Sequence, residues 1–293
     1  MAEPHELYAG LRFTFLLADQ YKFSGSWVYP ESRVPYSLLR LITRGTADFQ
    51  LDGETVAVGP GDVVLIPEGT RLSCQATGGE ISFISIRFIT SVKLGDSDFL
   101  SAYYGVPVVT HFGPEAPVRD RFEALHAAAV STSSARVFRI RGLLELIIAE
   151  LVERAAESSP PLGREQLLQV QSAVPAPGRG SAVKRDPRIE AVVDFLTHHP
   201  TVQADTDALC RLADLSPSAL RRLFKAHTGK TIGEFVTELR MMTAARMLLI
   251  TSERVGDIGR QVGYFDQNYF ARAFKGVFGV SPQAYRAVSR EQQ

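Results

Sequence analysis

The sequence has little cysteine, no net charge and no long apolar run. Cys74 and Cys210 are its only cysteines, so the 293-residue chain cannot depend on a disulfide framework, and we expect it in a reducing compartment, the cytoplasm. The balance of 32 Lys and Arg against 32 Asp and Glu excludes a uniformly basic or acidic protein. The longest apolar candidate, residues 143–152, contains Glu145 and Glu150 and falls short of the roughly 18 residues of a membrane helix, so no membrane partner is expected.

The short motifs of nucleophilic and nucleotide-dependent enzymes are absent as well. The sequence contains no Gly-x-Ser-x-Gly, no P-loop and no Gly-x-Gly-x-x-Gly. Cys210 lies inside a predicted helix, with no arrangement of His or Asp near it in the sequence that could activate it. We therefore expect no catalytic residues, no cofactor and no enzymatic activity.

Residues 159–187 divide the chain. This stretch is rich in Pro, Gly, Ser and Ala and has little to bury, which is typical of a linker. Strand-like patterns in residues 1–112 are followed by two helical patterns in 113–158, whereas residues 188–290 are helical throughout. The sequence therefore predicts an α+β protein of two domains. From residue 184 onward it carries 16 Lys and Arg against 12 Asp and Glu, a surplus that hints at a polyanionic partner.

A short pattern occurs twice near the end of the chain. RRLFKAHTG at 221–229 returns as ARAFKGVFG at 271–279, fifty residues later. In each copy apolar residues at i, i+3 and i+4 predict a helix with one buried face. Signals for both ends of each helix are present. The predicted N-caps are Ser216, followed by Pro217, and Asp266, and the predicted C-terminal glycines are Gly229 and Gly279.

A shorter helix precedes each copy, over 206–214 and 255–263, and a tight turn separates the two helices of each pair. Asp214 and Gly263 occupy these turns, where a positive φ is cheap for Gly and tolerable for Asp. The pattern predicts two helix-turn-helix units. Residues 231–250 predict a connecting helix of about 30 Å, close to the roughly 34 Å of one turn of B-DNA.

The outer faces of the two repeated helices carry side chains that suit DNA. Arg pairs with guanine, Asn and Gln with adenine, and Lys with phosphate. The candidate DNA-binding residues are Ser218, Arg221, Arg222, Lys225, Gln267, Asn268, Arg272 and Lys275. The alternative is a helical bundle with a chance repeat and a merely solvated basic face, which two matched copies with caps and turns make less favourable.

Residues 188–290 resemble the DNA-binding domain of the AraC/XylS family of transcription regulators. The resemblance rests on ITSERVGDIGRQVGYFDQNYFARAFKGVFGVSPQAYR at 250–286 and on LRRLFKAHTGKTIGEFV at 220–236. It implies seven helices with one recognition helix per unit. The family's base-reading positions fall on Ser218, Arg221, Arg222, Gln267, Asn268 and Arg272. Gly259 and Phe265 depart from the family pattern, in which Ala and a small polar residue are usual.

The N-terminal part predicts short strands and turns. A β-rich segment from Tyr36 is expected to end at Arg44-Gly45, and the following hairpin to turn at Asp52-Gly53. GPGDVVLIPEGTRLSC predicts a strand between two Gly/Pro turns, and residues 81–88 predict another strand. Strands at this spacing favour a sandwich or a small barrel.

The spacing Gly61-x5-Pro67-x-Gly69 resembles the second signature of the cupins, whose fold is a double-stranded β-helix, a β-barrel. Metal-binding cupins carry a paired His and a Glu in their first signature, but the corresponding segment here has no His, and Arg71 lies near the position of the second-signature His. We therefore expect a cupin-like barrel over residues 1–112 without a metal.

Without a metal, the barrel is expected to bind a small organic effector, for which the resemblance favours a sugar or a sugar-derived metabolite. Aromatic rings stack on sugars and Arg pairs with carboxylates or phosphates. The candidate effector-binding residues are Trp27, Tyr29, Arg33, Tyr36, Arg40 and Arg71. The alternative is that these aromatic residues are core and the arginines are solvated.

Two helices are expected between the barrel and the linker, over 116–130 and 134–157. The second has a wide apolar stripe, which either packs wholly within the chain or pairs with a second copy in a homodimer, as such helices do in AraC-family dimers.

The sequence thus predicts a DNA-binding transcription regulator that responds to a small-molecule effector. Its expected partners are double-stranded promoter DNA, RNA polymerase and a second copy of the chain, and activation is commoner than repression in the family that it resembles. Two alternatives stay open. One is a metal-free cupin that serves mainly as a dimerisation module beside a constitutive DNA-binding domain, and the other is a cupin enzyme fused to such a domain, which the missing histidines disfavour.

Overall fold

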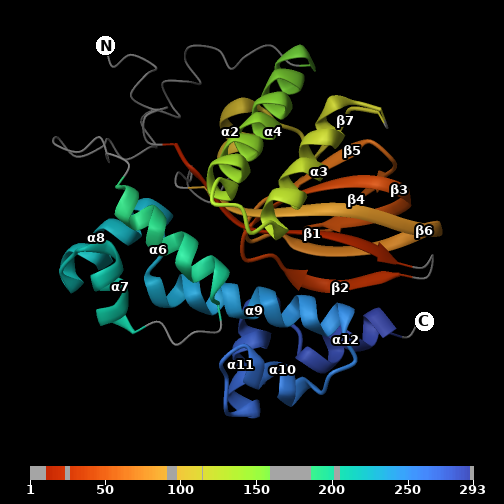
Figure 1. The fold of residues 1–293 in the computed structure, drawn as a ribbon. Coiled ribbons are helices and arrows are strands. Elements are labelled where there is room, and N and C mark those ends of the chain that lie inside the picture. The colour runs from red at the N-terminus through yellow and green to blue at the C-terminus, as the bar shows by residue number, and fades with distance from the viewer. Residues whose placement is uncertain are drawn as a thin grey trace.

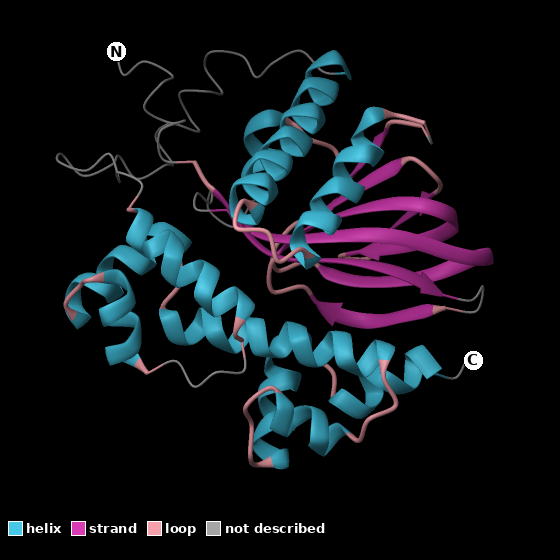
Figure 2. Ribbon diagram, viewed as in Figure 1, coloured by secondary structure: helices cyan, strands magenta, loops and turns pink. Residues whose placement is uncertain are grey.

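The structure is a computed structural model in which an antiparallel sheet domain lies beside a helical domain (Figures 1 and 2). It describes residues 11–23, 27–90, 98–113, 115–158, 186–200 and 205–290. Most of the predicted linker, residues 159–185, lies outside the described residues.

Seven strands in the described residues form one antiparallel sheet. Their bounds are β1 Phe13–Phe23, β2 Val28–Arg33, β3 Ser37–Leu51, β4 Glu54–Val58, β5 Asp62–Ile66, β6 Arg71–Thr90 and β7 Val109–His111. The strand order is β1-β6-β3-β5-β7, with β2 added to β6 and β4 added to β3. The predicted strand-rich domain is confirmed; the described edge strands β1 and β7 are not paired with each other.

The two long strands, β3 and β6, each belong to two parts of the sheet. The second half of β6 pairs with β1 and the start of β3, whereas its first half pairs with β2 and the end of β3. The pairing register shifts where β3 passes Gly45, which has φ +76°. The prediction that this strand ends at Arg44-Gly45 is therefore wrong, because the glycine forms a bulge within the strand instead of a turn after it.

The other turn predictions are confirmed. Asp52 and Gly53 have φ +51° and +97° and join β3 to β4, with Leu51 paired to Glu54. Two successive positive φ angles are the mark of a type I′ hairpin. Strand β5 lies between Gly61 and the Pro67–Gly69 turn.

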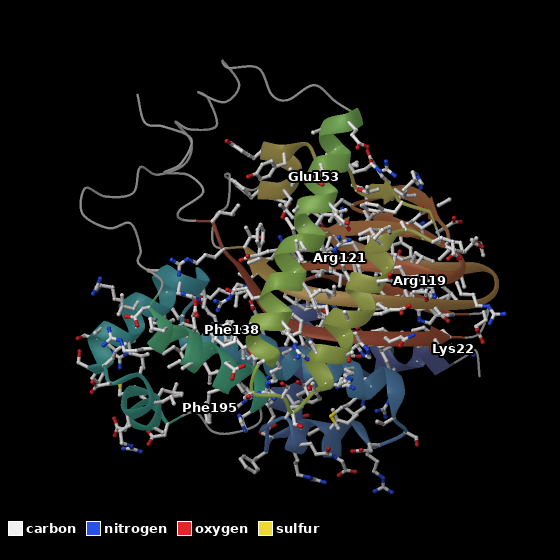
Figure 3. The ribbon with its side chains drawn as sticks, turned by 45° about the horizontal axis from the view of Figure 1, so that its top comes forward. Lys22, Arg119, Arg121, Phe138, Glu153 and Phe195 are labelled. Carbon is white, nitrogen blue, oxygen red and sulfur yellow. The ribbon has the colours of Figure 1, made fainter. Side chains whose placement is uncertain are left out.

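Helices cover the outer face of the sheet (Figure 1). They are α2 Phe99–Tyr104, α3 Pro117–Val130 and α4 Arg136–Ser158. The apolar side of α4 is buried with α3 against the sheet through Leu144, Ile147 and Leu151. Arg121, labelled in Figure 3, reaches from α3 to Glu150 of α4.

Within the described residues, the helical domain contains the seven helices that the resemblance implied. They are α6 Pro187–His198, α7 Thr206–Ala213, α8 Pro217–Thr228, α9 Ile232–Ile250, α10 Val255–Gln261, α11 Gln267–Phe278 and α12 Pro282–Arg290. Helix α9 has buried side chains on several of its sides. They include Met241, Met242, Ala244 and Ala245. Such all-round burial fits a helix that is contacted by both helical units and by the sheet domain.

The two domains are packed together, and one apolar cluster runs from the inner face of the sheet into the helical domain. The hydroxyl of Tyr285 in α12 donates to that of Tyr29 in β2, with 3.1 Å between the oxygens. Arg246 of α9 pairs with Asp19 of β1 at 3.0 Å. Figure 1 shows α9 lying along this side of the sheet domain, with α12 next to β2.

Candidate DNA-binding surface and ligand cavity

The first helix-turn-helix unit is built as its sequence predicts. Helix α7 ends at Asp214, which adopts the left-handed conformation at φ +49°. The Ser216 hydroxyl then accepts the backbone N–H of Ala219 and caps α8, which begins at Pro217. Helix α8 ends at Gly229, at φ +76°. Leu220 and Phe224 are buried, which fixes the opposite face of α8 toward solvent.

The second unit repeats this construction. Gly263 follows α10 at φ +86°, and the Asp266 carboxylate accepts the backbone N–H of Tyr269 to cap α11. A Cβ added at Gly259 of α10 would lie 3.0 Å from the Phe270 ring of α11. The two helices therefore approach each other closely, and the departure to Gly at 259 lets Phe270 pack directly on α10.

All eight predicted DNA-binding side chains are exposed on α8 and α11. The connecting helix α9 has 19 residues and thus a length of about 28 Å, and it runs between the two units (Figure 1). A groove beside α8 is lined by Ser218, Arg221, Arg222 and Lys225, and on its other side by α9.

Two aromatic residues next to these faces were not predicted as contacts. Phe265 is 89% exposed just before α11, and Tyr269 is 57% exposed within it. The departure from the family pattern at Phe265 was the signal that could have pointed to this surface.

A cavity on the inner face of the sheet contains four of the six predicted effector residues: Trp27, Tyr29, Tyr36 and Arg40. Arg33 and Arg71 lie elsewhere, in an exposed depression beside Phe278 and Val280 of the helical domain. Successive side chains along a strand point to opposite faces of the sheet. The six predicted effector residues are therefore divided between its inner and its outer face.

Several cavity residues were missed by sequence reasoning. From the strands they are Tyr21, Phe23, Leu38, Phe83 and Arg87, and from the helical domain they are Met242, Ala245, Arg246, Leu249 and Tyr285. No local pattern could have found the second group, because it reaches the cavity only through the packing of α9 and α12 on the sheet domain.

Arg87 is buried in a network of charged and hydroxyl groups at this cavity. Its guanidinium pairs with Asp19 at 2.8 Å and donates to the hydroxyls of Tyr21 and Tyr36. Asp19 also accepts Arg246 from α9, so one carboxylate connects the strands to the helical domain. Burial is the main reason why the pKa of Tyr21 rises to about 12 and why that of Tyr29 does the same.

Within the described residues no three His, Cys, Asp or Glu side chains gather as a metal site would require. One close pair of such side chains is present, in which His111 Nδ1 lies 2.6 Å from Asp62 Oδ1. None of the described helices is both long enough and apolar enough to span a membrane.

Comparison with known proteins assigns both parts of the chain. Residues 24–223 match the AraC-like ligand-binding domain and residues 209–287 match a helix-turn-helix domain. The chain is 41% identical to the transcriptional activator RhaR of Mannheimia succiniciproducens over 78 residues, 27% of this chain and 28% of that protein. It therefore spans less than a third of that relative's length.

Other similarities extend along most of the chain. The lactose operon transcription activator of Staphylococcus xylosus is 25% identical over 254 residues, 85% of this chain and 83% of that protein. The structure of ToxT from Vibrio cholerae O395 is 11% identical, covers 96% of this chain and 98% of its own, and gives a TM-score of 0.42. By its match to the AraC-like ligand-binding domain over most of its length, joined to a helix-turn-helix domain, the chain belongs to the AraC family of transcription regulators.

Proposed function

We propose that this protein regulates transcription by holding promoter DNA with both helix-turn-helix units while its sheet domain senses a small molecule. The observation that carries the proposal is the pair of exposed polar faces on α8 and α11, which are connected by the 19-residue helix α9. A face of this kind places Arg, Asn and Gln where they can reach base edges in a major groove.

The two units are proposed to occupy successive major grooves on one side of the duplex. The length of α9, about 28 Å, is near the roughly 34 Å that separates equivalent groove positions. In this arrangement Arg222 and Arg272 read bases, and Lys225 and Lys275 hold phosphates. The eight side chains remain exposed while the two domains are packed together, so DNA can reach them in this state.

The ligand is proposed to bind in the cavity between the sheet and helix α9. Residues of both domains line this cavity, so its occupant contacts the strands and the DNA-binding domain together. A ligand there changes how the helical domain is held, which is the simplest physical link between an effector and DNA. The curated relatives named above are activators, and activation with RNA polymerase as partner is the favoured outcome.

A second copy of the chain is a further proposed partner. Most of the apolar stripe of α4 is buried within the chain, but Phe138 remains 73% exposed and Leu146 52% exposed. Figure 3 shows Phe138 on the part of α4 nearest the helical domain. These two residues are the apolar surface through which α4 would pair.

The test is selection of bound sites from random duplex DNA by the full chain at a stated salt concentration. We expect a motif of two blocks, centred about one helical turn apart. Arg222→Ala and Arg272→Ala should each weaken binding to the selected site by about 1–3 kcal/mol, and each should relax the preference within one block only. Arg139→Ala, an exposed arginine on α4, is the matched control and should leave binding unchanged.

Equal losses on selected and random DNA would mean that the two arginines hold phosphates and do not read bases. A motif of one block would limit base reading to a single unit. Absence of any enriched site would contradict the proposed function.

A further inference from the structure

Two buried arginines line the ligand cavity, and only one of them has a counter-ion among the described residues. Arg87 pairs with Asp19 at 2.8 Å. Arg40 is 5% exposed, yet no described carboxylate lies within ion-pair distance of it. A guanidinium keeps its proton at any pH at which proteins fold, so a buried one without an anion is costly.

The contacts of Arg40 are all with neutral groups. Its Nε donates to the Ser85 hydroxyl at 3.1 Å, and one terminal nitrogen lies 3.5 Å from the Cys74 sulfur. Its carbon Cζ lies 4.4 Å from the centre of the Phe83 ring, a cation–π contact. Burial raises the pKa of the Cys74 thiol to about 12, so this sulfur is not an anion that could balance Arg40.

A second buried group at the same cavity, an N–H donor, has no acceptor among the described residues. Trp27 is 3% exposed, and its indole N–H has no hydrogen-bond partner among the described residues. A buried N–H without an acceptor is uncommon because it forfeits its bond with water. The cavity thus combines an unbalanced positive charge with an unused donor, and both call for an occupant that brings acceptors and negative charge.

The remaining walls of the cavity are largely apolar and aromatic. Phe23 stacks between Tyr21 and Trp27, with ring centres 5.7 and 5.0 Å apart. Leu38 and Phe83 add apolar surface. Flat apolar walls suit a ring or a short hydrocarbon chain. A free inorganic anion would leave them unused.

The volume of the cavity is about 20 Å³, enough for roughly one water molecule. An organic molecule therefore enters only if a wall moves. The strand walls are held by the hydrogen bonds of the sheet, whereas Met242, Ala245 and Leu249 belong to α9 and reach the cavity across the domain interface. The helical domain is the wall that can move.

We propose that the cavity binds a small organic acid, with its carboxylate on Arg40 and its apolar body against the aromatic wall, and that this acid displaces α9 and α12 from the sheet domain. The inference rests on the proposed function in that it uses the same ligand site. It narrows the ligand from any small metabolite to an apolar monocarboxylate. It also gives the ligand a physical route to the DNA-binding helices.

Trp27 is the only tryptophan in the chain, so intrinsic fluorescence reports directly on the cavity. The full chain is titrated with phenylacetate and with cyclohexanecarboxylate, and in parallel with the neutral amides of the two acids. We expect at least one acid to change the Trp27 emission saturably and to bind at least about tenfold more tightly than its amide. X-ray scattering of the acid complex should show a larger radius of gyration.

Variants connect the preference for the acid to Arg40. Arg40→Met should reduce acid affinity to that of the amide, and Arg40→Lys should keep the preference because it keeps the charge. The matched control is Arg44→Met, which removes an exposed arginine from the same strand and should bind the acid as the wild type does. The acid and amide comparison in the wild-type chain stands even if Arg40→Met fails to fold.

Equal binding of acid and amide, unchanged acid binding by Arg40→Met, or no saturable change up to about 10 mM of either acid would overturn the inference. DNA binding by the same preparation is measured alongside. A chain that binds its selected DNA but discriminates no acid refutes the ligand class and leaves the proposed function intact, whereas loss of DNA binding refutes the proposed function itself.

Discussion

Phe265 is a large apolar side chain in an unusual position. It lies between the turn at Gly263 and the capping Asp266, and 89% of its surface is exposed. Its neighbour Tyr264 is buried and packs on Phe270, so the backbone here is held in place while the Phe265 ring points to solvent. Because Gln267 follows two residues later on the proposed DNA-facing side, we expect the ring to contact a thymine methyl or a sugar of the bound DNA.

Replacement of Phe265 by Ser should therefore affect DNA binding without affecting the fold. We expect Phe265→Ser to weaken binding to the selected site by about 1 kcal/mol, through loss of apolar contact with DNA. Fluorescence anisotropy with a labelled duplex measures this. The thermal midpoint of unfolding of Phe265→Ser should differ from that of the wild type by no more than an ordinary surface substitution causes. Leu212→Ser, which changes another exposed apolar residue of the helical domain, is the control. Undiminished affinity of Phe265→Ser would show that the ring has no part in binding.

At the scale of elements, the bend in β3 at Gly45 lets one long strand serve both parts of the sheet. A Cβ on Gly45 would lie 2.1 Å from the carbonyl oxygen of Glu80, and its φ of +76° is unfavourable for other residues. Gly79 also has a positive φ, +56°, but has open space where a Cβ would be. At Gly45 both the space for a side chain and the positive φ require glycine, whereas at Gly79 only the positive φ favours it.

We expect Gly45→Ala to lower the free energy of unfolding by about 3 kcal/mol or more, because the clash with β6 is added to the strain of the positive φ. Gly79→Ala should cost only about 1 kcal/mol, from the left-handed conformation alone. Urea denaturation of both variants measures the difference. Equal effects would mean that β6 yields at Glu80 and that the bulge is not sterically enforced.

Local elements of this protein could be predicted because their signals are local. Ser216, Asp266 and Gly279 act through hydrogen bonds and φ angles within a few residues, and each lies where its pattern predicted. Gly45 was misread because a glycine in a strand pattern fits a turn and a bulge equally well. Only the pairing with β6, a long-range contact, decides between them.

The cavity could be predicted only in part, for the same reason. Trp27 and Arg40 were identified by residue type, but the partnership of Arg87 with Asp19 joins strands 68 residues apart. The contribution of α9 depends on packing between domains that are separated by the linker. Sequence periodicity describes which face of a helix is apolar, and it does not say which surface that face meets.

At the scale of the whole molecule, an ion-pair cluster holds the two domains together next to the cavity. Lys230, which precedes α9, lies 3.2 Å from Glu68 of the sheet domain and 2.7 Å from Glu238 of its own domain. Only 11% of the Lys230 side chain is exposed, so solvent screens the cluster weakly. Burial raises the pKa of Glu238, and Lys230 opposes that rise.

Removal of the central cation should separate the domains, since two carboxylates from opposite sides of the interface would then face each other. We expect Lys230→Met to shift the packing equilibrium toward separated domains by about 3 kcal/mol, seen as a larger radius of gyration in X-ray scattering. Adding Glu68→Gln to this variant should restore packing, because it removes one of the two like charges.

The same variant should show a stronger dependence on pH than the wild type, in which Lys230 limits the rise in the pKa of Glu238. Without Lys230 the pKa of Glu238 in the packed state rises further above its value in the separated state. Glu238 then binds its proton more tightly in the packed state than in the separated state. This difference favours packing fully at pH values below the pKa of Glu238 in the separated state. The contribution is lost as the pH rises through the pKa of Glu238 in the packed state. Scattering of Lys230→Met should therefore report packed domains near pH 5 and separated domains near pH 8. Separation that is equal at both values would mean that Lys230 holds the interface through its hydrogen bond to the Pro35 carbonyl and not through charge.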